Sequence, residues 1–76
     1  MVSLDSLETG QTGIIHSLNG GSGFISRISA MGFTPETTVT MVSRRSWGPV
    51  LVYLRDTEVA LGRREAGRIT VRREDA

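Results

Sequence analysis

Several residue types that carry chemistry are rare or missing in this chain. It has no cysteine and no lysine, and His16 is its only histidine. The lack of cysteine excludes both a disulfide framework and a thiolate metal site. With neither cysteine nor lysine, and with a lone histidine as base, the sequence offers no activated nucleophile and no P-loop lysine for phosphate. We therefore expect a protein that is not an enzyme.

Long apolar runs are also missing. No stretch approaches the roughly 18 apolar residues that a membrane-spanning helix needs, so direct membrane insertion is not expected. The opening segment, MVSLDSLETG, lacks the basic and apolar regions of a secretory signal peptide. A chain of 76 residues has room for one core, so residues 1–76 are expected to form a single cytoplasmic domain.

The charged residues are numerous but balanced. All nine basic residues are arginine, with adjacent pairs at 44–45, 63–64 and 72–73. Arginine pairs suit phosphate, because the guanidinium fork matches phosphate oxygens. Eight acidic residues lie among them, however, and the net charge is only +1. Since nucleic-acid-binding domains carry a clear basic excess, the pattern favours a mixed-charge solvated surface and no nucleic-acid partner.

The hydrophobic spacing is mostly that of strands. Alternation of apolar and polar residues, or β-prone apolar runs, predicts strands at 12–18, 38–42, 50–55, 58–62 and 68–72. A two-residue hairpin turn is expected at Asp56-Thr57, and one helical turn at 63–67. Leu4 and Leu7 flank a further single helical turn.

One segment changes to helical spacing. Its apolar face is formed by Phe24, Ile28 and Met31, and Ile25 broadens that face. Ser22 is suited to begin this helix as its N-cap, and Gly32 to follow its end in a left-handed conformation. A helix after the first strand, five short strands, and a helical turn before the last predict a mainly β fold, a small SH3-like five-stranded barrel.

The core of such a barrel follows from the strand alternation. The expected inward residues are Ile14, Val39, Met41, Val52, Leu54, Val59, Leu61, Ile69 and Val71. In the first strand, Ile14, His16 and Leu18 are expected on the buried side and Ile15 on the other. The outer strand of so small a barrel leaves an edge at which a second copy can pair, so a weak homodimer is one expected state.

His16 is the one residue to weigh as a metal ligand. Imidazole with a carboxylate, such as Glu8 or Glu36, suits zinc, iron and manganese. The sequence holds no second histidine at a spacing that would fix two ligands on one face. We therefore expect no metal site and no cofactor, with weak Fe(II) or Zn(II) binding at His16 left open. The alternative is a partly buried strand histidine with a satisfied ring nitrogen.

Trp47 lies in the loop sequence RRSWGP and has two interpretations. It either packs over the mouth of the barrel or stands exposed as an anchor for a protein partner, since tryptophan and arginine dominate interface hot spots. In the second case Arg44, Arg45, Trp47 and Gly48 form the partner-binding candidate, with Arg27 on the helix surface as a further contact.

The order of these motifs resembles a known family. The motifs are Leu4, Leu7, Gly10 and Gly13-x-Ile15; Arg27-Ile28, then Met31-Gly32-Phe33-x-Pro35; Gly48-Pro49; and Val59-Ala60-Leu61-Gly62-Arg63, Ala66 and Ile69-x-Val71. Together they resemble the ferrous iron transport protein A (FeoA) family over nearly the whole chain. The resemblance implies a small cytoplasmic SH3-like protein that docks on FeoB, the membrane Fe(II) transporter, and modulates it. Glu36 departs from the glycine usual in that family, so either a strained or a re-formed turn is expected there.

Two other functions remain open. The same fold occurs as the C-terminal domain of DtxR-type repressors, so the resemblance also allows a metal-responsive, transition-metal-binding regulatory domain. A generic SH3-like interaction domain with another partner is the third hypothesis, because a fold does not fix a function.

Overall fold

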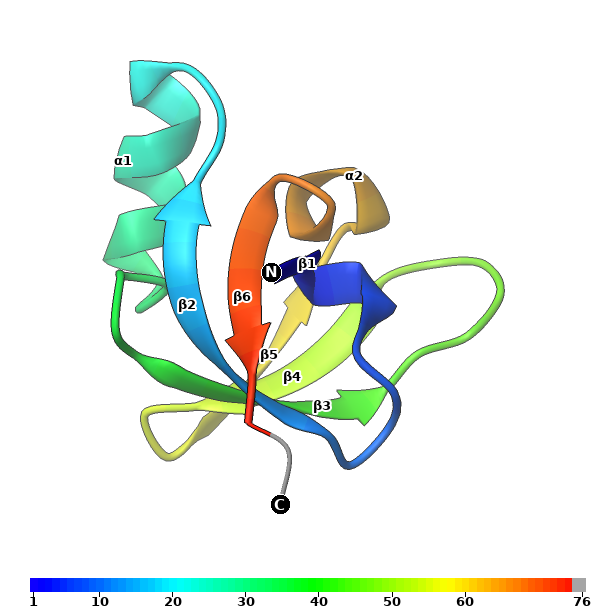
Figure 1. Ribbon diagram of the computed structural model, residues 1–76. Helices are drawn as coiled ribbons and strands as arrows, with labels where there is room; N and C mark the ends of the chain where they lie inside the picture. Colours follow the sequence, from blue (N-terminus) through cyan, green and yellow to red (C-terminus); the bar gives the residue numbers. More distant parts are fainter. Residues whose placement is uncertain (75–76) are drawn as a thin grey trace.

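One antiparallel sheet makes up most of the molecule. The computed structural model describes residues 1–74 (Figure 1). Its elements are β1 (Val2–Ser3), the 3₁₀ turn η1 (Leu4–Ser6), β2 (Thr12–Leu18), α1 (Ser22–Ala30), β3 (Thr38–Ser43), β4 (Val50–Leu54), β5 (Thr57–Leu61), α2 (Arg63–Ala66) and β6 (Ile69–Arg73). The strand order is β1-β6-β2-β3-β4-β5. The prediction of a mainly β, SH3-like fold is confirmed, with the short strand β1 added to the five expected.

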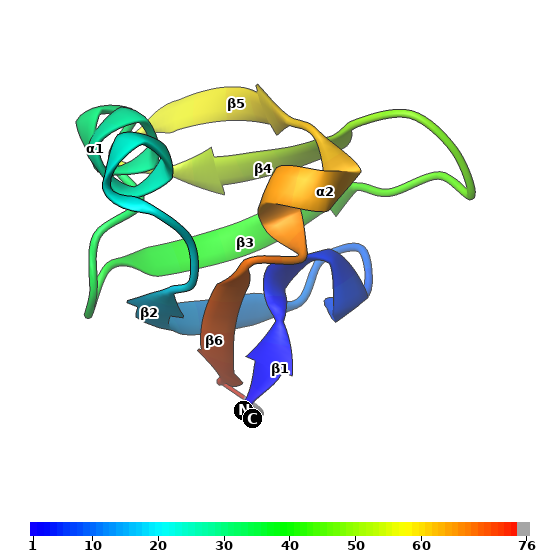
Figure 2. The same ribbon diagram turned by 90° about the horizontal axis from the view of Figure 1, so that it is seen from above.

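The sheet curls around a single core, and its two ends differ. Seen from above, α1 covers one end and the loop between β3 and β4 projects at the other (Figure 2). Helix α2 lies between β5 and β6, on the side where the curled sheet would otherwise be open. Within residues 1–74, no helix has the length and apolar character needed to cross a membrane.

The end of α1 follows the glycine-dependent geometry expected from the sequence. Gly32 has φ 105° and donates its N–H to the carbonyl of Ser29 at 3.0 Å. The next residue, Phe33, donates to the carbonyl of Ile28 at 3.2 Å. This pair of hydrogen bonds is a Schellman motif, which needs a left-handed residue and therefore favours glycine. It turns the buried Phe33 back onto the buried Ile28.

The rest of α1 differs from the expectation. Gly21, and not Ser22, is the N-cap, so the helix begins one residue earlier than predicted. Ile25 and Met31 are 37% and 39% exposed, so the apolar face is narrower than the sequence suggested. The helix has nine residues and ends at Ala30, so it makes about two and a half turns.

The first long strand buries the opposite side from the one predicted. Ile15 is fully buried, Ile14 is only half-buried and His16 is exposed. The cause is a β-bulge: Ile15 and Ser17 pair with adjacent residues of β6, so His16 is the extra residue. The bulge shifts the alternation, which lets Leu18 pack against the core as predicted, although Ile15 precedes it by an odd number of residues.

The hairpin between β4 and β5 turns one residue earlier than expected. Leu54 pairs with Thr57, so the two loop residues are Arg55 and Asp56, not Asp56 and Thr57. Their φ values are 50° and 63°. Positive φ at both positions is the type I′ geometry, whose twist matches that of the flanking strands.

The core is apolar throughout the described chain. Its buried residues are Leu4, Leu7, Ile15, Phe24, Ile28, Phe33, Val39, Met41, Val50, Val52, Leu54, Leu61, Ala66, Ile69 and Val71. Val59 is half-buried against this cluster, and Ile14 lies outside it. Most of the predicted strand residues are confirmed, and the additions are Leu4, Leu7, Ile15, Phe33, Val50 and Ala66.

Candidate protein-binding surface

The loop between β3 and β4 carries Trp47, an exposed large hydrophobic residue. Trp47 is 69% exposed, so it does not pack over the barrel mouth. Gly48 follows it with φ 81°, a conformation that glycine adopts without strain. Tryptophan is enriched among interface hot spots, so an exposed tryptophan beside a groove is a candidate anchor for a partner.

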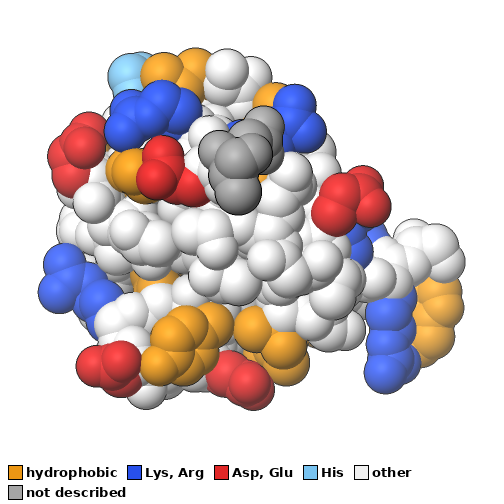
Figure 3. All heavy atoms as spheres, turned by 60° about the horizontal axis from the view of Figure 1, so that its bottom comes forward, with side chains coloured by type: hydrophobic (Ala, Val, Ile, Leu, Met, Phe, Trp, Pro, Cys, Tyr) orange, Lys and Arg blue, Asp and Glu red, His pale blue; other side chains and the backbone are white. Residues whose placement is uncertain are grey.

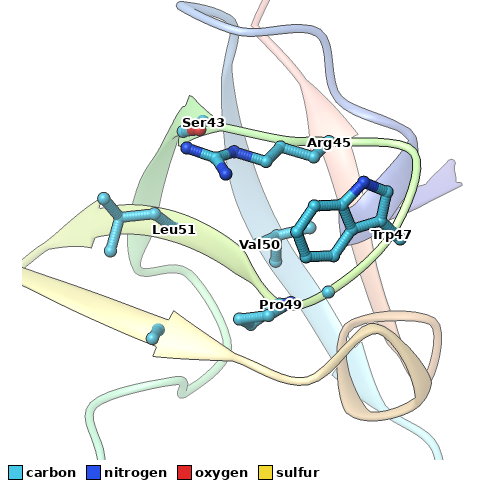
Figure 4. Close-up of a pocket in the computed structure, with 8 residues that line it drawn as sticks. Ser43, Arg45, Trp47, Pro49, Val50 and Leu51 are labelled. Carbon is cyan, nitrogen blue, oxygen red and sulfur yellow. The ribbon is translucent and has the colours of Figure 1, made fainter.

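Arg45 and Trp47 contact each other on this loop. The Arg45 guanidinium carbon lies 6.0 Å from the centroid of the indole ring, within cation–π range. Figure 4 shows Arg45 on the arm of the loop that leaves β3 and Trp47 on the arm that returns to Pro49 and β4, with both side chains extending between the arms. Between them is a hollow of about 230 Å³, lined by Ser43, Arg45, Trp47, Gly48, Pro49, Val50, Leu51 and Ala60. We call it the tryptophan groove.

A second hollow lies beside the groove and is basic. It measures about 450 Å³ and is lined by Arg44, Arg45, Ser46 and Arg63. We call it the arginine pocket. Figure 3 shows basic and hydrophobic side chains gathered on the projecting loop, whereas charges of both signs are scattered over the rest of that face. Arg44 also lies 3.6 Å from a carboxylate oxygen of Glu8.

Arg63 was not singled out from the sequence. The feature of the sequence that could have indicated it is the Arg63-Arg64 pair, which we interpreted as part of a mixed-charge surface. Helix α2 places the two side chains differently: Arg64 is exposed, and Arg63 is half-buried beneath the loop in the arginine pocket. Adjacent helical residues point in different directions, so only a fold could tell them apart.

Arg27 does not lie with the other four candidates. It forms an ion pair with Glu65, which ties α1 to α2. Its guanidinium carbon also lies 5.9 Å from the Phe24 ring centroid, and that of Arg68 lies 5.6 Å from the same ring. Figures 1 and 2 both show α1 and the β3–β4 loop at opposite ends of the molecule. Arg44, Arg45, Trp47 and Gly48 therefore share one surface, and Arg27 belongs to another.

His16 stands alone on the outer side of the β2 bulge. Its side chain is exposed, unlike the partly buried histidine considered from the sequence. In the described part of the chain, no group of three or more His, Cys, Asp and Glu residues is placed to hold a metal ion. Glu8, one of the carboxylates considered with it, lies near Arg44 instead.

Comparisons with known proteins agree with this fold. The family model described as the FeoA domain matches residues 2–73. A crystal structure of an iron uptake regulatory protein (FeoA) is 29% identical with a TM-score of 0.92, and the match covers 96% of this chain and 97% of that one. Stenotrophomonas maltophilia FeoA, solved in complex with zinc, is 25% identical with a TM-score of 0.82, over 93% of this chain and 89% of that one.

A more distant protein shares the fold alone. A manganese-dependent transcriptional repressor is 20% identical with a TM-score of 0.86, and the match covers 95% of this chain but only 41% of the repressor. No curated protein matched in a sequence search. The family model spans nearly the whole chain, and the full-length structural match has the same family name. This chain therefore belongs to the FeoA family.

Proposed function

We propose that this protein is a non-catalytic, cytoplasmic accessory factor of ferrous iron uptake that docks on a FeoB-type membrane transporter. Membership of the FeoA family supports the link to ferrous iron transport. The observation that carries the docking role is the exposure of Trp47 beside a groove, with Arg45 held against its ring. The proposed role needs no resident metal or cofactor.

The loop has the composition of an interface hot spot. Tryptophan gives a large apolar contact area at a low cost in conformational entropy, and arginine adds oriented hydrogen bonds. Contact with Trp47 restricts the Arg45 side chain before a partner arrives, so less conformational entropy is lost on binding. The surrounding basic groups would accelerate encounter with an acidic partner.

A binding experiment with matched variants tests the docking role. Purified transporter, or membranes that contain it, would be incubated with the wild-type chain, with Trp47→Ala and with Ile25→Ala. Ile25 is the control because it is an exposed apolar residue on α1, far from the loop. We expect Trp47→Ala to bind at least about tenfold more weakly, as is typical of a hot-spot residue, and Ile25→Ala to bind normally.

A cellular experiment tests the role in iron uptake. Ferrous iron uptake would be measured in cells that lack this gene and are complemented with wild type, Trp47→Ala or Ile25→Ala at equal protein levels. We expect uptake to fall with Trp47→Ala and to stay normal with Ile25→Ala. The proposal is wrong if neither purified nor membrane-embedded transporter retains the wild-type chain and uptake is unchanged in its absence.

A further inference from the structure

The tryptophan groove and the arginine pocket are two halves of one surface. Arg45 lines both hollows, so a ligand that fills one lies beside the other. The groove is mostly apolar, with Trp47, Pro49, Leu51 and Ala60 among its lining residues. The arginine pocket is lined by arginine and serine only.

The positive charge of the arginine pocket is poorly balanced. Among residues 1–74, Arg44 is the arginine of this pocket that has a carboxylate within ion-pair distance, at 3.6 Å from Glu8. The Glu8 side chain is 76% exposed, so solvent screens this pair and weakens it. In residues 1–74 no ion pair is formed by Arg45 or Arg63. The pocket therefore has net positive charge, and the guanidinium groups of Arg45 and Arg63 are not neutralised by an ion pair.

Arg63 adds a second, independent sign of a missing partner. Its Nε and one terminal nitrogen are buried and have no hydrogen-bond partner in the described chain. Buried guanidinium donors without acceptors are costly, whereas donors that meet an oxyanion form short, strong hydrogen bonds. A carboxylate entering the pocket would meet the exposed guanidinium groups of the two loop arginines, and a change in the Arg63 side-chain rotamer would turn its buried donors toward the same carboxylate.

The two halves together indicate what the ligand is. A free inorganic anion would use the arginine pocket and leave the groove empty. A peptide segment with acidic residues next to a large apolar residue would fill both. We propose that this surface binds such an acidic–apolar segment of a protein, with its carboxylates in the arginine pocket and its apolar side chain in the tryptophan groove. The identity of that protein as the iron transporter rests on the proposed function above.

The chemistry is tested with a synthetic peptide and the full chain. The probe is a short capped peptide with the core Glu-Glu-Leu-Phe, added to isotope-labelled protein while backbone amide shifts are followed. We expect saturable shifts of the backbone amides in the loop between β3 and β4 and in α2. The affinity of the peptide should fall as the salt concentration is raised. Peptides with the core Gln-Gln-Leu-Phe or Glu-Glu-Ser-Ser should each bind at least about tenfold more weakly, because each loses one half of the contact. Equal binding of all three peptides, or saturation by inorganic phosphate with no peptide binding, overturns the proposal.

Charge-matched variants locate the site. Arg45→Gln and Arg63→Gln should each lower the affinity for the Glu-Glu-Leu-Phe peptide by about tenfold or more, because charge-assisted hydrogen bonds are lost. Arg64→Gln is the control: it removes the same charge from α2 at an exposed residue that does not line the pocket. Arg45 is exposed, so its variant keeps the test valid if Arg63→Gln fails to fold. Equal weakening by all three variants would mean general charge attraction and would overturn the assigned site.

An array of overlapping peptides separates this inference from the proposed function. The peptides would cover the cytosolic segments of the transporter and be probed with wild type and Arg45→Gln. Binding confined to acidic–apolar segments, and lost with Arg45→Gln, supports the inference. If the intact transporter binds but no acidic segment does, the inference fails and the docking role stands. If the Glu-Glu-Leu-Phe peptide binds while the intact transporter does not, the docking role fails and the chemistry of the surface stands.

Discussion

The backbone N–H of Glu36 donates a hydrogen bond to the carbonyl of Ile15 at 2.7 Å, which joins the corner before β3 to β2. Glu36 makes this bond from φ 73°, the left-handed region in which a Cβ is strained. Thr37 adds a turn bond to the Thr34 carbonyl at 3.1 Å. Of the two alternatives considered for Glu36, a strained turn or a re-formed one, the structure has the strained one. Surrounding hydrogen bonds hold the residue in a conformation that glycine would adopt without strain.

Glu36→Gly should therefore stabilise the protein. Relief of a left-handed residue is worth about 1–2 kcal/mol, and the greater chain entropy of glycine takes back about 0.5–1 kcal/mol. We expect a net gain of about 0.5–1 kcal/mol, measured as a higher midpoint of urea unfolding with an unchanged slope. Glu58→Gly is the control, because Glu58 is an exposed residue of β5 and should lose about 0.5–1 kcal/mol. If both variants lose stability alike, Glu36 is not strained.

The hairpin turn between β4 and β5 offers a second stabilising change. Arg55 and Asp56 both have positive φ, and the type I′ turn prefers Asn-Gly there. The double variant Arg55→Asn with Asp56→Gly should gain about 1 kcal/mol, or about 4–8 °C in Tm for a domain of this size. Thermal unfolding followed by circular dichroism measures it. Asn-Gly placed instead at the turn first expected, Asp56-Thr57, should destabilise the protein, since Thr57 already pairs with Leu54.

Sequence reasoning succeeded where one local signal had one structural meaning. Gly32 after an amphipathic segment predicts a helix end, and the structure has a Schellman motif there. It failed at β2, because the extra residue of a bulge has no signature of its own there. His16 and Ile15 could exchange faces without any change in composition, and only the pairing with β6 decides which is buried.

The candidate surface was predictable only in part. Trp47 and the arginines beside it stand next to one another in the sequence, so their loop could be identified. Arg63 comes from α2 and reaches the arginine pocket through the tertiary fold. Arg27 was grouped with the loop residues, but in the fold it pairs with Glu65, which is far away in the sequence. Contacts between distant segments are the information that spacing does not carry.

Truncation to alanine should destabilise the protein strongly at Phe33 and hardly at all at Trp47. Phe33 is fully buried, so Phe33→Ala should cost about 3–5 kcal/mol and leave a domain of this size largely unfolded. Trp47 is 69% exposed, so Trp47→Ala should change the free energy of unfolding by no more than about 0.5 kcal/mol. Urea unfolding of both variants measures the contrast. A large loss with Trp47→Ala would mean that Trp47 supports the fold and would weaken its assignment to a partner.

Tyr53 should ionise at a higher pH than a free tyrosine. Its hydroxyl donates a hydrogen bond to Asp56 Oδ1 at 3.1 Å, and this bond, followed by the negative charge of Asp56, raises the pKa of Tyr53 above 10.0. Because the folded-state pKa is the higher one, the associated stability is present below pH 10 and is lost as the pH rises through the folded-state pKa.

An absorbance titration of the phenolate checks this prediction. We expect the wild-type midpoint above 10.0 and the Asp56→Asn midpoint closer to 10.0, because the variant loses the charge of the acceptor. High salt should lower the wild-type midpoint only in part, since it screens charge more than it weakens a hydrogen bond. Identical midpoints in the two proteins would contradict the assigned contact.

Metal binding distinguishes the accessory role from the metal-responsive alternative. A single exposed imidazole without further ligands binds divalent metals weakly, and His16 has no ligand cluster around it in residues 1–74. We expect anaerobic titration with Fe(II), and titration with Zn(II), to show no saturable one-to-one site in wild type. Circular dichroism should give the same Tm with and without either metal, because a ligand that binds the native state raises Tm.

His16→Ala and Glu8→Gln are the informative variants for this experiment. Neither should change the metal titration if the protein has no site. Stoichiometric binding in wild type that His16→Ala abolishes would instead favour the metal-responsive alternative. Sedimentation with and without Zn(II) covers the remaining case, in which two copies each contribute a His16 to a shared ion. A zinc-dependent dimer lost with His16→Ala would assign the site to the dimer, because His16 is exposed on the outer side of the β2 bulge and is accessible to a second copy.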